Sequence, residues 1–105
     1  MGMHYRQLGN TGLMASEIGM GCEGFGEDNY AMAKTLIDMA KEHGVNYIDL
    51  YASDPKLRAA VGEALCGCRE KFIIQSHICS VWKDGQYKRS RDLLEVKAGF
   101  EDMLR

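Results

Sequence analysis

Short apolar runs that alternate with helical patterns constrain the fold of this 105-residue chain more than any other feature. The runs begin at residues 17, 45 and 71, so successive runs start 28 and 26 residues apart. Such a distance suits one strand followed by one helix, and strands separated by helices pair in parallel through right-handed crossovers. The rhythm therefore predicts an α/β fold with three parallel strands at residues 17–21, 45–50 and 71–76.

The helical segments between these runs have clear start and stop signals. Asp28 is predicted to cap the first helix, and Gly44 to end it in the left-handed conformation that glycine adopts readily. Asp54 and Pro55 open the second helix, and Gly67 follows its end. The positions predicted to be buried are Ala33, Leu36, Ile37 and Ala40 in the first helix, Leu57, Val61, Ala64 and Leu65 in the second, and Leu93, Val96, Phe100 and Met103 in a third that begins near Ser90.

The first sixteen residues follow a different pattern. Short runs at residues 5–8 and 13–16 flank the turn-forming residues Gly9, Asn10, Thr11 and Gly12. This arrangement predicts a β-hairpin over residues 1–16. No linker or low-complexity stretch divides the remainder, so residues 1–105 are expected to form one domain.

Composition excludes several classes of protein. Hydrophobic residues make up 46% and charged residues 27% of the chain, which is typical of a globular protein. The net charge of −2 gives no general attraction to nucleic acid or to an anionic membrane. No apolar run approaches the roughly 20 residues of a membrane span, and the start of the sequence does not resemble a secretory leader, so we expect a cytoplasmic protein.

The four cysteines show no metal-binding pattern. Cys66 and Cys68 are separated by one residue, a spacing that fits neither a zinc knuckle nor a thioredoxin motif, and Cys22 and Cys79 lie far from them. We therefore expect reduced thiols and no metal site.

A glycine motif offers one alternative fold. Gly19, Gly21 and Gly24 match G-x-G-x-x-G, and Asp49 ends the next predicted strand, where a Rossmann domain places an acid on the ribose. Two features oppose a Rossmann-type dinucleotide-binding domain. The first strand is half polar, and the helical pattern starts only after residues 26–28, whereas a pyrophosphate site needs a helix that opens inside the glycine loop.

Several segments resemble the aldo-keto reductase family, in order and in spacing. Residues 5–13 look like its opening hairpin, residues 16–22 like its first barrel strand, residues 43–49 like the segment that carries a catalytic aspartate, and residues 62–65 and 69–74 continue the match. Residues 48–51 and 75–79 are similar to a divergent subset of the family from anaerobes. The resemblance implies the N-terminal part of a (β/α)8 TIM barrel, from a family that reduces aldehydes and ketones with NADPH.

The family's catalytic positions are only partly matched. Asp49 matches the aspartate, whereas Asp54 stands in place of the proton-donating tyrosine and His77 in place of the lysine. The family's histidine and its main cofactor-binding loops would lie beyond Arg105. The resemblance therefore implies a partial oxidoreductase domain that is inactive alone, and no cofactor-binding residue is assigned within it.

Asp49 and His77 are candidate catalytic residues because they end neighbouring strands, which lie about 4.8 Å apart in a parallel sheet. If both face the same side they can pair, and a carboxylate neighbour favours the charged imidazolium. We hypothesise that His77 replaces the lysine, either activating Tyr51 or donating a proton itself. Tyr51 shares the facing of Asp49 and is the third candidate. The alternative is that His77 is a satisfied polar residue at a strand end and that Tyr51 packs with its hydroxyl at the rim.

Residues 82–91 form a basic segment that contains Trp82 and Tyr87. Basic and aromatic residues together can hold a phosphate or a nucleic acid. A solvated loop after the third strand is the favoured interpretation, because the whole chain is negatively charged and the segment is short.

An open arc of three strands has consequences for association. Only closure of a sheet into a barrel removes its free edges, so this sheet is predicted to have two exposed edges and an exposed apolar inner face. We therefore expect a homo-oligomer. Two further possibilities are that copies jointly assemble a reductase site for a small carbonyl substrate, and that the chain is a non-catalytic binding or regulatory module.

Overall fold

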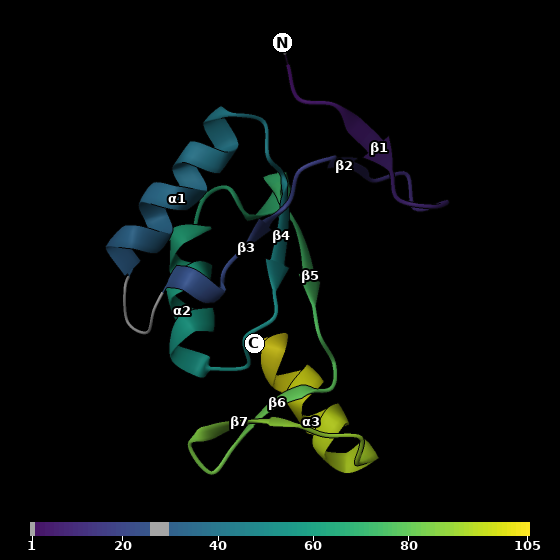
Figure 1. Ribbon diagram of the computed structural model, residues 1–105, viewed down its shortest axis with the longest axis vertical. Helices are drawn as coiled ribbons and strands as arrows, with labels where there is room; N and C mark the ends of the chain where they lie inside the picture. The colour runs from purple at the N-terminus through teal and green to yellow at the C-terminus, as the bar shows by residue number, and fades with distance from the viewer. Residues whose placement is uncertain (1, 26–29) are drawn as a thin grey trace.

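The computed structural model describes residues 2–25 and 30–105, in which a parallel sheet lies between two small antiparallel hairpins (Figure 1). None of the helices in these residues is both long and apolar enough to cross a membrane. The strands are β1 (Tyr5–Gln7), β2 (Met14–Ser16), β3 (Met20–Gly21), β4 (Tyr47–Leu50), β5 (Ile73–Ser76), β6 (Ser80–Lys83) and β7 (Gln86–Arg89). The helices are α1 (Tyr30–Glu42), α2 (Pro55–Ala64) and α3 (Leu93–Met103), with 3-10 turns η1 (Glu23–Phe25) and η2 (Arg69–Lys71).

The central sheet has the strand order β3-β4-β5, and all its strands are parallel. Helices α1 and α2 cover one face and leave the other open (Figure 1). The predicted α/β class with consecutive parallel strands is confirmed. The strands are shorter than predicted, because β3 contains only two residues and η2 occupies the start of the run predicted at residues 71–76.

Local signals explain where the helices begin and end. The Asp54 carboxylate accepts a hydrogen bond from the backbone N–H of Lys56 at 2.9 Å, as the predicted cap of α2. Gly44 and Gly67 follow α1 and α2 with φ angles of 81° and 85°, which side chains other than glycine rarely adopt. The cap predicted at Asp28 lies outside the described residues.

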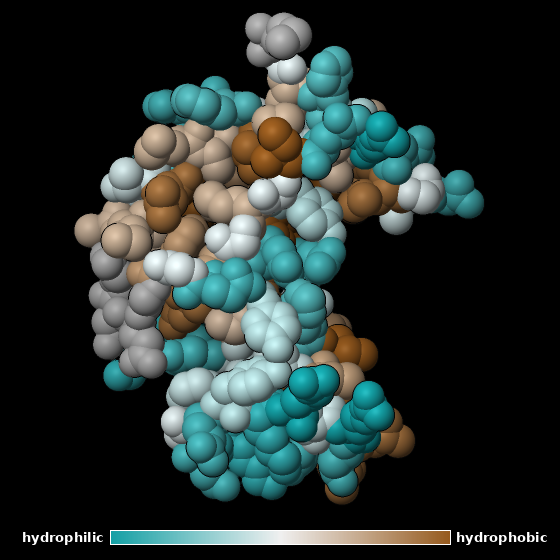
Figure 2. Space-filling model, viewed as in Figure 1, coloured by the Kyte–Doolittle hydropathy of each residue, from teal (hydrophilic) through white to brown (hydrophobic). Residues whose placement is uncertain are grey.

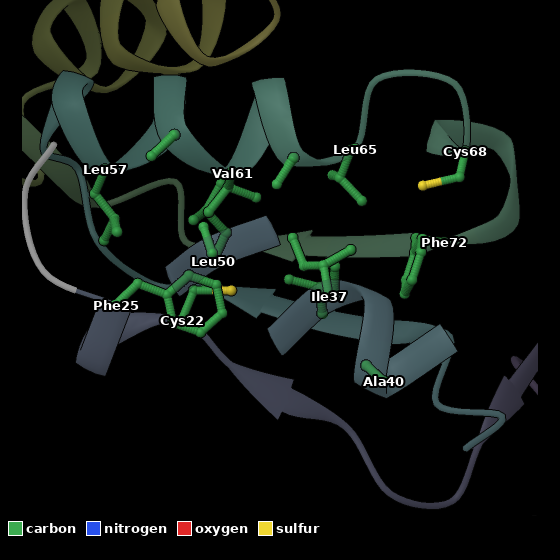
Figure 3. Packing of buried hydrophobic residues seen from close by; sticks show 14 residues of the cluster. Cys22, Phe25, Ile37, Ala40, Leu50, Leu57, Val61, Leu65, Cys68 and Phe72 are labelled. Atoms are coloured by element: carbon green, nitrogen blue, oxygen red, sulfur yellow. The ribbon is translucent and has the colours of Figure 1, made fainter. Parts of the chain in front are cut away.

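A hydrophobic core fills the space between the two helices and the sheet (Figure 3). Side chains alternate along a strand, so Ile48 and Leu50 of β4 point into this core and their neighbours point to the open face. The predicted stripes of α1 and α2 lie here, with Leu36 only partly buried. The buried members are Cys22, Phe25, Ala33, Ile37, Ala40, Ile48, Leu50, Leu57, Ala60, Val61, Ala64, Leu65, Cys68 and Phe72.

Helix α3 departs from the prediction. Its expected stripe is not buried, since Leu93 is 82% exposed and Phe100 43% exposed. The reason is its position, because α3 packs against β6 near one end of the sheet rather than on the face that α1 and α2 cover (Figure 1). Contact is close at Gly99, where an added Cβ would lie 3.0 Å from Val81 Cγ1.

The segment predicted as a solvated loop is a β-hairpin, so that prediction was wrong. Strands β6 and β7 pair antiparallel around Asp84 and Gly85, with Lys83 opposite Gln86. Both turn residues have positive φ, at 53° and 74°. A two-residue turn of this kind matches the right-handed twist of the strands, and Asp-Gly is one of its preferred sequences.

The hairpin predicted over residues 1–16 is confirmed for the part of it that the structure describes. Strands β1 and β2 pair with Tyr5 opposite Ser16. The Tyr5 hydroxyl donates to the carbonyl oxygen of Gly44 at 2.7 Å, and the Ser16 N–H donates to Asn46 Oδ1 at 2.7 Å. These bonds fix the hairpin beside the amino end of β4, at the end of the sheet opposite β6–β7.

Candidate active site

Polar side chains form a connected row on the open face of the sheet, which corrects the expectation of an apolar inner face. The Tyr47 hydroxyl donates to Gln75 Oε1, and Gln75 Nε2 donates to Asp49 Oδ1 at 3.4 Å. Alternation explains the difference, because the apolar residues of β4 face the helices and leave the opposite face to Tyr47 and Asp49. The polar groups extend along this face towards the carboxyl ends of β4 and β5.

Asp49 and His77 meet at this end of the sheet. His77 Nε2 lies 2.7 Å from Asp49 Oδ1, as predicted from their places at the ends of adjacent parallel strands. Their side chains are 35% and 37% exposed for His77 and Asp49, so water and small molecules can reach both. A carboxylate accepts, so Nε2 carries a proton here and Nδ1 is left for another partner.

Tyr51 lies beside this pair, but its hydroxyl bonds elsewhere. Its ring meets the His77 ring edge to face, with centroids 4.8 Å apart and planes at 73°. Its hydroxyl lies 2.7 Å from that of Tyr87 in β7. This hydrogen bond is the main cause that raises the pKa of Tyr51, which makes its phenol a weaker acid than an ordinary tyrosine. The structure therefore brings together all three residues predicted from the sequence.

Tyr87 was missed as a site residue because its segment was expected to be a loop. The available signal was Asp84-Gly85 between two runs of strand-forming residues, which favours a hairpin. Nothing in the sequence indicated that this hairpin would fold back towards Tyr51.

Two buried serines hold the β6–β7 hairpin against the loop between β4 and α2. The Ser53 hydroxyl donates to the carbonyl oxygen of Val81 at 2.8 Å, and the Ser80 hydroxyl donates to that of Tyr51 at 2.9 Å. Both serines are almost fully buried. Hydrogen bonds shielded from water persist better than exposed ones, so the hairpin has a fixed place beside the site.

Cys22 lies close to Asp49 but is not suited to be a nucleophile. Its backbone N–H donates to the Asp49 carbonyl oxygen at 3.2 Å, and its side chain is fully buried. Burial, with the charges of Glu23 and Asp49, raises the pKa of the thiol to about 12, so it stays protonated at neutral pH. Over residues 2–25 and 30–105, no three His, Cys, Asp or Glu side chains are grouped so that they could hold a metal ion.

Asp54, which stands in place of the family tyrosine, has a structural role as the cap of α2. Its carboxylate binds a backbone N–H group. A group used in this way satisfies a donor at the helix start.

The glycine motif does not form a phosphate site. A Cβ added to Gly21 would lie 2.8 Å from Glu23 Oε2, so a carboxylate occupies the space beside the motif. The chain then enters the short turn η1, whose Phe25 is buried in the core. A negative charge at this place repels a pyrophosphate, which argues against the Rossmann alternative.

Two lysines of the basic segment are paired with an acidic residue of α3. Lys83 and Lys88 both bind the carboxylate of Glu95, and the Ser90 hydroxyl donates to it as well. These bonds, led by that of Lys83, lower the pKa of Glu95 to about 2. The two lysines are therefore engaged within the fold, which argues against their use in binding a phosphate or a nucleic acid.

Fold and site together define the class: the chain is similar, in sequence and in structure, to the N-terminal part of aldo-keto reductases. Among curated proteins it is similar to YqkF, an uncharacterized oxidoreductase of Bacillus subtilis, with 36% identity over 87 residues. That match covers 79% of this chain and 28% of YqkF. No family model matches the sequence.

Solved structures of aldo-keto reductases are also similar to this chain. An aldo-keto reductase from Bacillus halodurans, in its holo form, matches with a TM-score of 0.79 and 30% identity over 98% of this chain and 36% of its own. A Pseudomonas aeruginosa protein assigned to the same family matches with a TM-score of 0.79 and 29% identity, over 98% of this chain and 42% of its own. The family resemblance and the partial TIM-barrel fold predicted from the sequence are thus confirmed. The chain spans less than half the length of these relatives.

Proposed function

We propose that this chain is the N-terminal part of an oxidoreductase that reduces carbonyl compounds with a nicotinamide cofactor, NADPH by family resemblance. The observation that carries the proposal is the 2.7 Å contact between His77 and Asp49 at the carboxyl ends of β4 and β5. In barrels of this type the reactive groups lie at this end of the strands. The similarity to reductases supports the reaction class.

In this proposal His77 gives a proton to the carbonyl oxygen of the substrate. Asp49 accepts a hydrogen bond from the Nε2–H group and orients the ring, so that the proton transferred to the substrate is the one that Nδ1 carries in the imidazolium form. Tyr51 is less suited to this step, because its hydroxyl is bonded to Tyr87 and its pKa is raised. Of the two roles considered for His77, direct donation is therefore the one we propose.

The described residues do not by themselves fit a dinucleotide. The glycine motif is occupied by the Glu23 carboxylate, and Lys83 and Lys88 bind Glu95 instead of standing free for phosphate. We assign no hydride step to this chain, and we propose that it is inactive alone.

The first test is a fluorescence titration of the chain with NADPH, together with an assay of NADPH oxidation in the presence of aldehydes and ketones. We expect no saturable binding and no oxidation by the chain alone. Tight binding would show that it contains a complete cofactor site.

The second test places the chain in front of the remaining part of the Bacillus halodurans reductase, in exchange for that protein's own N-terminal part. We expect the fusion to reduce carbonyls and His77→Ala to lower turnover by about 100-fold, within the range for a general acid. His43→Ala is the matched control, since His43 is exposed at the end of α1. A folded fusion that binds NADPH and keeps full turnover after His77→Ala would refute the proposed role.

A non-catalytic, self-associating module is the second candidate function. The observation that favours it is the exposure of apolar side chains on and just after α3, including Leu93 and Leu104. Carbonyl reduction by the fusion supports the first candidate. Association of the chain without any reduction by the fusion supports the second.

A further inference from the structure

We propose that Tyr87 is a positioning residue of the Asp49–His77 site, and that it acts by holding Tyr51 against the imidazole ring. The inference rests on the proposed function, because it takes His77 as the reacting group. An unbroken series of contacts supports the inference. Tyr87 contacts Tyr51, Tyr51 contacts His77, and His77 contacts Asp49.

Each contact in this series restricts one motion. Asp49 fixes the Nε2 end of the His77 ring, but a single hydrogen bond leaves the ring free to swing about that atom. The edge of the Tyr51 ring limits this swing, with centroids 4.8 Å apart. Tyr51 is itself exposed at the rim, where an unsupported side chain samples several rotamers. The 2.7 Å bond to Tyr87 selects the rotamer that contacts His77.

Tyr87 can play this part because its own place does not depend on the side chain of Tyr51. It stands opposite Trp82 in the β6–β7 register, which the Asp84-Gly85 turn sets. The Ser53 bond to Val81 ties the partner strand β6 to the loop after β4. The hairpin is thus attached through β6 to the loop after β4, and it presents the Tyr87 hydroxyl to the site.

The test compares Tyr87→Phe with Tyr5→Phe by NMR of the whole chain. Both changes remove one phenol hydroxyl that makes a 2.7 Å hydrogen bond, but the Tyr5 bond to Gly44 lies at the opposite end of the sheet. In Tyr87→Phe we expect shifted ring resonances of Tyr51 and His77, and a fall in the Tyr51 pKa, since the Tyr87 bond is the main cause that raises it. In Tyr5→Phe we expect neither change.

A second measurement does not depend on any variant. In the unmodified chain we expect nuclear Overhauser contacts between the rings of Tyr51 and Tyr87, and between those of Tyr51 and His77. Their absence, or a Tyr87→Phe chain whose Tyr51 and His77 signals match those of Tyr5→Phe, would overturn the inference.

The activity of the fusion separates this inference from the proposed function. We expect Tyr87→Phe to lower turnover about tenfold with little change in KM, because the ring is misplaced and not removed. If the fusion shows no reduction while the NMR pattern holds, the proposed function fails and the positioning contact stands. If reduction requires His77 but neither NMR nor turnover responds to Tyr87→Phe, the inference alone fails.

Discussion

Individual thiols in this fold differ sharply in their surroundings. Cys22 is fully buried, and its pKa is raised to about 12, mainly by burial. Cys66, just after α2, is exposed. Because the thiolate is the reactive form, exposure and ionisation together decide which cysteine an alkylating reagent modifies.

Iodoacetamide should therefore modify Cys66 rapidly at mildly alkaline pH and leave Cys22 unmodified until the chain unfolds. Peptide mass spectrometry over time measures both rates. Cys66→Ser is the control, because it removes the fast site without touching the core. Equal rates at Cys22 and Cys66 in the folded chain would contradict the burial of Cys22.

The sequence was sufficient to predict part of the site. Asp49 and His77 could be paired in advance, because parallel strands bring their carboxyl ends to one edge whatever the details of packing. Tyr87 could not, because its position depends on serine bonds between segments almost thirty residues apart. The inner face was mispredicted because a barrel interior was assumed to be apolar, although Tyr47 and Gln75 are visible in the sequence.

Among the elements, α3 packs against β6 and is also bound to the hairpin by a charged cluster around Glu95. Glu95, in the first turn of α3, binds Lys83 and Lys88 from the two strands and Ser90 from the link that follows β7. Its carboxylate has a pKa lowered from the ordinary 4.5 to about 2. A group whose pKa is lower in the folded state stabilises that state when ionised.

The contribution of Glu95 should be complete above pH 4.5 and be lost as the pH falls towards about 2. Hydrogen exchange at the amides of β7 and α3, followed by NMR over this range, measures it. We expect faster exchange at low pH, and Glu95→Gln should exchange fast throughout. Glu101→Gln, at an exposed position of the same helix, should behave like the unmodified chain. Unchanged exchange in Glu95→Gln would contradict the role of the cluster.

Element prediction succeeded where the signal was local. Asp54-Pro55 and Gly67 mark the limits of α2 through capping chemistry alone. The stripe of α3 correctly indicated a helix, but helical period cannot say which surface covers it. The prediction that this stripe is buried was wrong, because the β6–β7 hairpin, which was not predicted, carries α3 away from the sheet face.

The whole molecule leaves apolar and backbone groups uncovered. Strands β3 and β5 each have a neighbour on one side only in the described sheet. Leu93, the first residue of α3, is 82% exposed, and Leu104, just after its end, is 72% exposed. Free strand edges and apolar patches are common sites of association. Self-association, expected from the sequence, remains a prediction.

Analytical ultracentrifugation should show the chain as dimers or larger species. The double change Leu93→Lys, Leu104→Lys should shift it towards monomer, because charge opposes burial of α3. Leu13→Lys in the β1–β2 hairpin introduces the same charge far from α3 and should have little effect. A monodisperse monomer of the unmodified chain would refute the prediction.

Figure 2 shows hydrophilic side chains gathered over the end of the molecule that carries the β6–β7 hairpin. The open face of the sheet also carries hydrophilic groups, from Tyr47, Asp49 and Gln75. An apolar surface packed against that face would remove water from the amide of Gln75, the carboxylate of Asp49 and the imidazole of His77. Each buried donor or acceptor that is left without a hydrogen-bond partner costs about 1–3 kcal/mol. This face of the sheet therefore disfavours non-specific apolar association and favours a binding partner that offers matching hydrogen-bond donors and acceptors.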